Sequence, residues 1–346
     1  MRSLLSLLAA GLCALAPPAT GQEARAAFGN GDAPFLIRST TDIAIIRPVL
    51  EAFVQARPDL AVTYEQWGSN ALFERSRADC ATGQGAADAI LSSAVQQMVW
   101  LVNAACARPH RSAATLALPD SRRWRDELWG VTSEPAVIVY NKAALAGIEV
   151  PRSRFALLDA MRARPDLFRG RIATYDIAAS GLGYLFAFSD SLEATTFGAL
   201  LESFDRLDAV ATCCSAEIIA GVADGRYVAA YNVLGSYAAS ASRPEVGIIL
   251  PEDYTLLLSR AYMIPTGARH PEAAAALLDF LLSDAAQQRL IRAGLVNSVD
   301  AAETGLTPSA RRVIALSPRL LVALDPTQRR RLLEAWAATF EEAGGE

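Results

Sequence analysis

Apolar stretches alternate with short polar segments along most of the chain. The apolar run 35–37 is followed, after Arg38, by four possible helix-capping side chains at 39–42, and Pro58 ends the next helical pattern. The spacing of apolar positions predicts strand 35–38, helix 45–54 (regular from about Pro48), strand 60–65, helix 71–78 and strand 88–93. This order indicates a parallel sheet with helices on its faces.

The same alternation resumes in the middle of the chain and gives way to helical patterns near the end. We expect strands at 136–140, 171–175, 210–212, 228–232 and 246–250, and helices at 154–163, 184–188, 215–223, 271–293, 308–316 and 326–340. At 346 residues the chain is longer than one hydrophobic core usually organises. The sequence therefore predicts an α/β protein with two lobes.

The amino terminus has the pattern of a secretory signal peptide. Arg2 precedes an apolar run over 4–16, which ends at two prolines and the small residues 19–21. A membrane-spanning helix needs about 20 apolar residues, which this run does not reach. We expect cleavage near Gly21, removal of residues 1–21, and export to the periplasm.

Composition excludes several classes of function. The chain is 52% hydrophobic and 20% charged, which is typical of a folded protein. Its net charge of -5 argues against binding to nucleic acid. With only two histidines, His110 and His270, a histidine-rich metal site is excluded, and we expect no metal and no cofactor.

Four cysteines remain after the predicted cleavage, an even number in an oxidising compartment. Cys80 and Cys106 flank an apolar unit, and we predict a disulfide between them. Cys213 and Cys214 are adjacent, and either a vicinal disulfide or two buried thiols fits the pattern.

Several segments in a fixed order resemble periplasmic solute-binding proteins of ABC-type uptake systems. The resemblance rests on residues 39–41, 88–94, 134–142, 170–176 and 225–237, and on Pro265 before residues 270–274. It points to the type II group, whose members bind ferric ion, thiamine or phosphorylated sugars. The resemblance implies a two-lobed periplasmic-binding-protein fold (type II), each lobe a mixed sheet flanked by helices and joined by hinge strands.

The resemblance also implies lobe boundaries and partners. Hinge strands would fall near 132–139 and 250–258. Lobe 1 would comprise residues 22–133 plus about 255–346 with the C-terminal helices, and lobe 2 residues 134–254. The chain, expected to be a monomer, would pass a small ligand to an inner-membrane ABC permease or, alternatively, report it to a membrane sensor kinase.

Ligands in open α/β sheets bind beyond the carboxyl ends of strands, where helices begin and favour anions. Hydroxyl, amide or glycine residues occupy four such places, and aromatic or acidic side chains lie near them. The candidate ligand-binding residues are Ser39, Thr40, Thr41, Trp67, Ser69, Asn70, Ser92, Ser93, Tyr175, Asp176, Ser180, Gly181 and Tyr237. Each polar residue could equally be a helix cap, and each aromatic a core residue.

The polar set favours an anionic organic phosphate or carboxylate, with a thiamine-like cation as the alternative. Ferric binding is disfavoured because the chain lacks the adjacent tyrosines of ferric-binding relatives and neither histidine lies in an expected cleft loop. Glu134 could contact ligand or form a hinge ion pair. An exported hydrolase is disfavoured, since no G-x-S-x-G motif is present.

Overall fold

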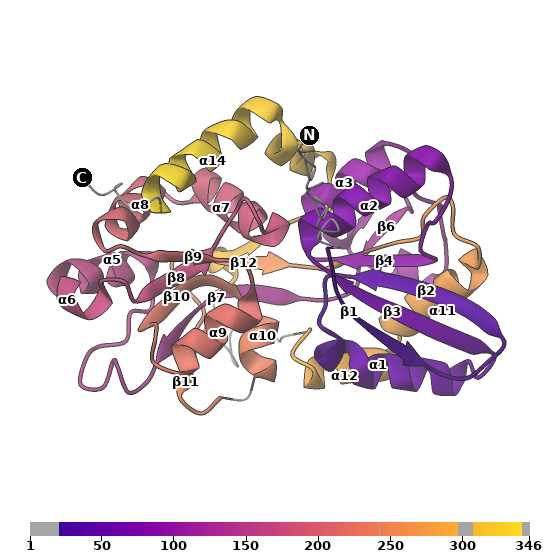
Figure 1. The fold of residues 1–346 in the computed structure, drawn as a ribbon, viewed down its shortest axis with the longest axis horizontal. Coiled ribbons are helices and arrows are strands. Elements are labelled where there is room, and N and C mark those ends of the chain that lie inside the picture. The colour runs from indigo at the N-terminus through magenta and orange to yellow at the C-terminus, as the bar shows by residue number, and fades with distance from the viewer. Residues whose placement is uncertain (1–20, 242, 297–306, 341–346) are drawn as a thin grey trace, which may run out of the picture.

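Two lobes, each built on a β-sheet, make up the molecule (Figure 1). The computed structural model describes residues 21–241, 243–296 and 307–340. All of the predicted signal peptide except Gly21 lies outside these residues. Within the described part of the chain, no helix combines the length and the apolar character needed to cross a bilayer.

The first lobe has a mixed sheet in the order β1-β3-β2-β4-β13-β6-β5. Its strands are β1 (Gln22–Phe28), β2 (Ala33–Ser39), β3 (Leu60–Trp67), β4 (Ala89–Ser92), β5 (Arg123–Trp124), β6 (Leu128–Gly130) and β13 (Ala261–Met263). Strand β2 is parallel to both β3 and β4, as the alternation predicts, whereas β1 and β13 join antiparallel. The sheet packs with helices α1 (Ile43–Ala56), α2 (Ser69–Thr82), α3 (Val95–Asn103), α4 (Ala113–Leu116), α11 (Pro271–Leu282) and α12 (Asp284–Arg292).

The second lobe has a sheet in the order β14-β12-β7-β10-β8-β9, with β11 also paired to β7. Its strands are β7 (Glu134–Asn141), β8 (Ile172–Tyr175), β9 (Val210–Thr212), β10 (Ala229–Leu234), β11 (Val246–Ile249), β12 (Thr255–Leu258) and β14 (Arg311–Val313). Its helices are α5 (Arg154–Ala163), α6 (Pro165–Phe168), α7 (Gly181–Glu193), α8 (Phe197–Arg206), α9 (Ser215–Ala223), α10 (Gly235–Ser240) and α14 (Pro326–Phe340).

Several expected elements differ in the structure. Helix α1 begins at Ile43 and runs through Pro48, with Val49 and Phe53 on its buried face. The single helix expected over 271–293 is two, because Ser283 leaves the helical conformation and caps α12. Residues 308–316, expected as a helix, form a 3-10 turn at Pro308–Ala310 and then β14, which pairs in parallel with β12.

The carboxyl-terminal segment packs with both lobes rather than with the first alone. Strand β12 pairs with β7, so residues 255–258 belong to the second sheet, and β14 follows them there. A 3-10 helix, Pro318–Leu324, contacts α3 of the first lobe, and α14 contacts α8 of the second. Trp336 of α14 is buried and donates from Nε1 to the carbonyl of Tyr175 (3.2 Å). Because Trp336 is buried against the second lobe, α14 belongs to that lobe, although the expected boundary at 255 assigned it to lobe 1.

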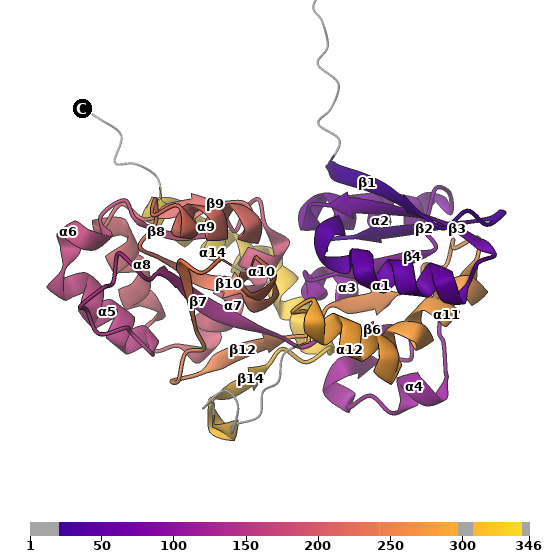
Figure 2. The same cartoon turned by 90° about the horizontal axis from the view of Figure 1, so that it is seen from below.

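The chain crosses between the lobes on neighbouring strands. Strand β6 of the first sheet leads into β7 of the second, and β12 leads back into β13. Figure 2 shows β7 and β12 side by side as they run toward the first lobe. The second crossing falls at Ser259–Arg260, one to two residues beyond the expected hinge at 250–258, because β12 stays paired with β7 up to Leu258.

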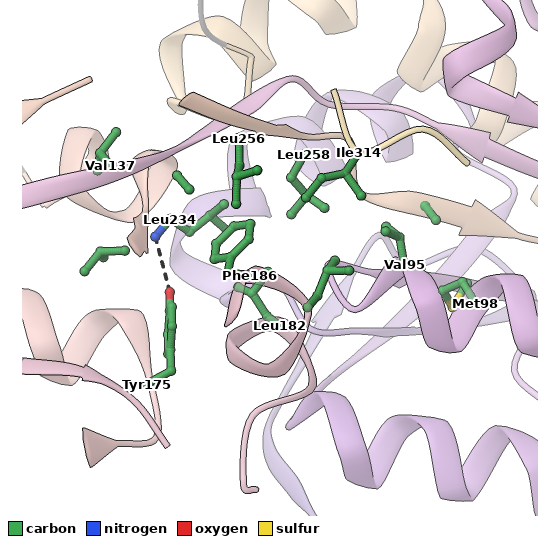
Figure 3. Close-up of a cluster of buried hydrophobic side chains, with 14 of the residues drawn as sticks. Val95, Met98, Val137, Tyr175, Leu182, Phe186, Leu234, Leu256, Leu258 and Ile314 are labelled. Carbon is green, nitrogen blue, oxygen red and sulfur yellow. Dashed lines mark hydrogen bonds between the residues drawn. The ribbon is translucent and has the colours of Figure 1, made fainter. Parts of the chain in front are cut away.

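One hydrophobic cluster joins the lobes beside these crossings (Figure 3). Val95 and Met98 of α3 pack in the same cluster as Leu182 and Phe186 of α7. These side chains are at most 7% exposed. The two lobes therefore share an apolar contact, and the polar loops described next face each other along it.

Candidate functional site

Polar loops follow two neighbouring parallel strands of the first lobe. Because β2 and β4 are paired, the loops after them meet. Thr40 Oγ1 lies 3.1 Å from Ser93 Oγ and accepts from the Ser93 amide at 3.0 Å. Ser39 Oγ accepts from the Thr41 amide (3.0 Å), and Ser92 Oγ accepts from the Ala94 amide (3.2 Å). Ser39 and Ser92 thus shape the two loops, and Thr40 and Ser93 present their hydroxyls.

The start of α2 in the first lobe contacts the start of α7 in the second. The Gly181 amide donates to Ser69 Oγ (2.8 Å), and Asn70 Nδ2 donates to the carbonyls of Ala178 and Ala179 (2.9 Å each). Ser180 caps α7, accepting from the Gly183 amide (3.0 Å). Each of these predicted residues therefore already has a protein partner, and the lobes are held closed at this point.

Gln96 and Gln97, which the sequence analysis did not single out, add to the same contact. Gln96 Nε2 donates to the Gly181 carbonyl (2.7 Å), and Gln97 Nε2 donates to Asn70 Oδ1 (2.8 Å). In the sequence, two consecutive glutamines near the start of an apolar helix were the pattern that could have identified these residues. Among the contacts of the described residues, the Oε1 atoms of both are buried without a hydrogen-bond donor.

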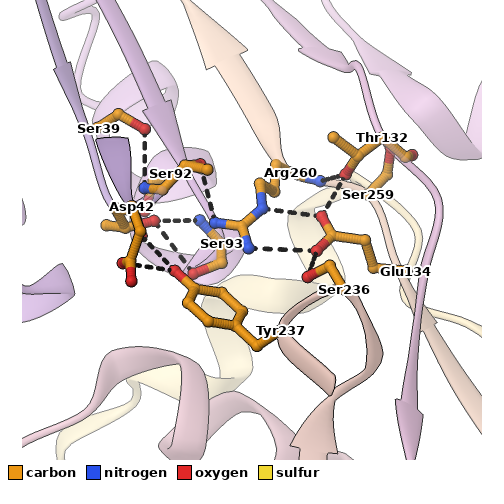
Figure 4. A network of polar contacts seen from close by, with 12 residues as sticks. Ser39, Asp42, Ser92, Ser93, Thr132, Glu134, Ser236, Tyr237, Ser259 and Arg260 are labelled. Carbon is orange, nitrogen blue, oxygen red and sulfur yellow. Dashed lines mark hydrogen bonds and ion pairs between the residues drawn. The ribbon is translucent and has the colours of Figure 1, made fainter. Parts of the chain in front are cut away.

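A buried ion pair lies where the chain crosses between the lobes (Figure 4). Arg260 Nε is 2.8 Å from Glu134 Oε1, and the side chains are 1% and 0% exposed. Arg260 also donates to Thr41 Oγ1 (3.0 Å), while Thr132 and Ser236 donate to Glu134. Glu134 is thus in a hinge ion pair rather than on the wall of a cavity. Arg260 was not among the residues predicted from the sequence, although an arginine between two apolar strands indicates a buried acidic partner.

Tyr237 of α10 reaches across to the first lobe. Its hydroxyl donates to Asp42 Oδ1 (2.9 Å), and its ring lies 5.7 Å from the Arg260 guanidinium carbon. Burial raises the pKa of Tyr237 well above its ordinary value, and the nearby Arg260 charge opposes this only partly. Tyr237 is therefore a neutral donor that links the lobes.

A cavity of about 360 Å³ lies between the lobes, next to this tyrosine. Seven candidate residues line it, from both lobes: Thr40, Trp67, Ser69, Ser93, Tyr175, Ser180 and Tyr237. The remaining candidates are not in its wall: Ser39, Thr41, Asn70, Ser92, Asp176 and Gly181. Asp176 instead accepts from the Ala178 and Ala179 amides and shapes the loop before α7.

The aromatic candidates in the wall are fixed by polar partners. Trp67 Nε1 donates to Glu65 Oε2 (3.2 Å), and the buried Arg38 lies 5.7 Å from its ring. Tyr175 is buried, and its hydroxyl lies 2.5 Å from Ser215 Oγ. Burial raises the pKa of Tyr175 to about 12, against the opposing effect of the Ser215 hydrogen bond.

The charged side chains in the cavity wall are carboxylates, whereas Arg38 and Arg260 lie behind the rings of Trp67 and Tyr237. Among the described residues, the cavity lining includes the carboxylates Glu23, Asp42 and Glu217 but no lysine or arginine. Two helices, α2 and α9, begin in the wall, and neither has a side-chain cap on its first amides. Backbone amides and hydroxyls are thus the donors available to an anionic group, and the carboxylates can accept from hydroxyl or amino groups.

Both cysteine pairs are disulfides. Cys80–Cys106, as predicted, ties α2 to the residues after α3. Cys213 and Cys214 form the vicinal disulfide, one of the two alternatives, and they are not buried but line the cavity. His110 contacts Asp279 and His270 precedes α11, so neither histidine is part of the cavity wall.

Two mixed-sheet lobes joined by crossing strands, with a polar cavity between them, define a type II periplasmic binding protein fold. The family model for "Bacterial extracellular solute-binding protein" matches residues 38–296. The crystal structure of the substrate-binding protein of an ABC transporter from Agrobacterium tumefaciens is 31% identical, with a TM-score of 0.85 over 92% of this chain and 98% of that one.

The chain belongs to this family of bacterial extracellular solute-binding proteins, which are not enzymes, and it is a substrate-binding protein of the ABC transporter type. No curated protein matches the sequence significantly.

More distant structures share the fold alone. The periplasmic binding protein AfuA from Actinobacillus pleuropneumoniae, with exogenous fructose-6-phosphate bound, is 16% identical with a TM-score of 0.69, covering 90% of this chain and 100% of that chain. Apo ferric ion-binding protein A from Pasteurella haemolytica is 16% identical with a TM-score of 0.67, covering 90% and 99%.

Proposed function

We propose that this protein binds a small organic solute with one anionic group, a phosphate or a carboxylate, in the cavity between its lobes. The observation that carries the proposal is that hydroxyls and uncapped helix starts from both lobes line one cavity. An anion there receives directional hydrogen bonds from both lobes only when they are closed, so binding favours the closed state.

The carboxylates refine the class of solute. Because the described lining holds the carboxylates Glu23, Asp42 and Glu217 without a lysine or arginine, a solute with two or more anionic groups would be repelled. A solute that combines one anionic group with hydroxyl or amino groups can accept hydrogen bonds from the donors of the wall and donate hydrogen bonds to its carboxylates. The distant AfuA structure holds a phosphorylated sugar, which has this combination.

Ferric ion fits the wall less well. Tyrosinate oxygens are the expected ligands, but Tyr175 and Tyr237 are not adjacent, and burial raises the pKa of both, which keeps them protonated. Their hydroxyls already contact Ser215 and Asp42.

The solute would be delivered in the periplasm to the inner-membrane permease of an ABC importer. Export is supported by the amino-terminal pattern, and cleavage near Gly21 would leave β1 intact, since that strand starts at Gln22. Mass determination of the protein recovered from the periplasm tests the cleavage site, and an intact Met1 there would contradict it.

The test begins with mass spectrometry of solute released from the purified protein, followed by calorimetry with sugar phosphates, carboxylates and thiamine. We expect the phosphates or carboxylates to bind. Binding of thiamine alone would contradict the proposal.

A matched pair of variants tests the site itself. Ser180→Leu removes the α7 cap and puts a bulky group into the cavity wall, whereas Ser153→Leu removes the equivalent cap of α5 outside it. Each should cost about 1 kcal/mol of stability. Only Ser180→Leu should weaken solute binding; equal affinity of the two variants would exclude this loop from the site.

A further inference from the structure

The vicinal disulfide lies at the start of α9, in the wall of the interlobe cavity. Cys214 is the residue before α9, and both cysteines line the cavity with Glu217. Cys213 and Glu217 are exposed, and Cys214 is half-buried. A reductant in solution can therefore reach this bond.

This disulfide contributes little to the stability of the fold. Disulfides stabilise mainly by restricting the unfolded chain, and the effect grows with the length of the closed loop. Cys80 and Cys106 are 26 positions apart, whereas Cys213 and Cys214 are separated by 1. The Cys213–Cys214 bond closes almost no loop, so it hardly restricts the unfolded chain. Its position in the cavity wall therefore suggests a role other than stabilising the fold.

In the oxidised protein, the two bonded sulfurs lie beside a carboxylate. The ligand atoms of Cys213, Cys214 and Glu217 all lie within 4.8 Å of one another, and Cys213 Sγ is 3.6 Å from Glu217 Oε2. Among the described residues, no other group of three histidine, cysteine, aspartate or glutamate side chains is gathered this closely. Two thiolates and a carboxylate suit a thiophilic divalent cation such as Zn²⁺ or Cd²⁺.

We propose that Cys213, Cys214 and Glu217 form a redox-controlled site that binds a thiophilic divalent cation when the disulfide is reduced. A dithiol reductant supplies two electrons and two protons, which convert the disulfide into two thiols while the reductant becomes a disulfide. The cation then displaces one proton from each thiol and is held by both sulfurs and the Glu217 carboxylate. A fourth position remains for water or for a group of the solute.

The bound cation would change the character of the cavity. The described wall has no lysine or arginine, so the ion would supply its strongest positive charge. Among the described lining residues of the oxidised protein, the Gln66 and Trp67 N–H groups already donate to carboxylates, which leaves backbone amides and hydroxyls for an anion. The site's existence does not depend on which solute the protein carries.

The experiment uses the full exported protein, oxidised or treated with dithiothreitol and then freed of it without oxygen. Alkylation followed by mass spectrometry shows which cysteines are reduced. Cd²⁺ is then titrated by calorimetry and by the ultraviolet thiolate-to-cadmium charge-transfer band. We expect one Cd²⁺ per reduced protein with this band, and no such binding to the oxidised form.

Four variants locate the site, each checked for its melting temperature. Cys213→Ser and Cys214→Ser each leave one sulfur ligand, so binding should weaken and the band should lose about half of its intensity or more, and Glu217→Gln should weaken binding roughly tenfold. Glu202→Gln, on an exposed face of α8, should bind as the parent does. Equal Cd²⁺ binding by the oxidised and reduced proteins, unchanged binding by reduced Cys213→Ser, or a disulfide that stays intact in dithiothreitol would each overturn the proposal.

Discussion

Replacing Glu134 by glutamine should destabilise the protein strongly, because it leaves the Arg260 charge buried. The two side chains are 0% and 1% exposed, and their closest atoms are 2.8 Å apart. Burial by itself would lower the pKa of Arg260, but the charge and hydrogen bond of Glu134, together with Tyr237 and Tyr64, outweigh that effect, so its pKa is raised. Glutamine keeps the shape of glutamate but removes that charge.

The expected loss is about 3 to 5 kcal/mol, the usual cost of breaking a buried ion pair by removing one partner. The matched control is Glu252→Gln. Its partner, Arg152, lies at 3.3 Å, but these side chains are 57% and 76% exposed. Solvent screens such a pair, so the control should lose at most about 0.5 kcal/mol.

Urea unfolding, followed by circular dichroism and tryptophan fluorescence, measures both losses. Coincident transitions are needed to convert midpoints into free energies for a two-lobed chain. The double variant Glu134→Gln with Arg260→Met should recover much of the loss, since no unpaired charge then remains. Equal destabilisation by Glu134→Gln and Glu252→Gln, or no recovery in the double variant, would refute this reasoning.

Three further outcomes are expected. Replacing both Cys80 and Cys106 by serine should cost about 3 kcal/mol, measured by urea unfolding, and a loss below about 1 kcal/mol would contradict the loop-entropy estimate. Stability measured by urea unfolding should fall between pH 10 and pH 12, because burial raises the folded-state pKa of Tyr175 from 10.0 to about 12 and the unfolded chain ionises first; equal stability at pH 10 and pH 12 would contradict this. Tyr237→Phe removes the hydrogen bond to Asp42 and should shift the solute-free protein toward an open form with a larger radius in X-ray scattering, and an unchanged radius would show that this bond does not hold the lobes closed.

Local patterns in the sequence determined many of the elements. Helices α5, α9 and α14 and strand β9 have the bounds that apolar spacing and capping residues predict. These signals depend on near neighbours in the chain, which is why they can be read without the fold. The Cys80–Cys106 pairing was also predictable, because the compartment and the even cysteine count left few alternatives.

Other features depend on residues far apart in the chain. Strand β14 is a strand because its residues pair with β12, although their local pattern suggested a helix. Glu134 and Arg260 are 126 positions apart, so only the meeting of two hinge strands shows that they pair.

The same distinction between local patterns and long-range contacts applies to the candidate site. The sequence placed Thr40, Ser93 and Ser180 at strand ends and helix starts, because capping is a local property. Only the tertiary structure decided that these three line one cavity, and that Ser39 and Asp176 turn their side chains to nearby backbone instead. How the two lobes pack determines which hydrogen-bond donors stay available to a solute, and a local sequence pattern carries no information about that packing.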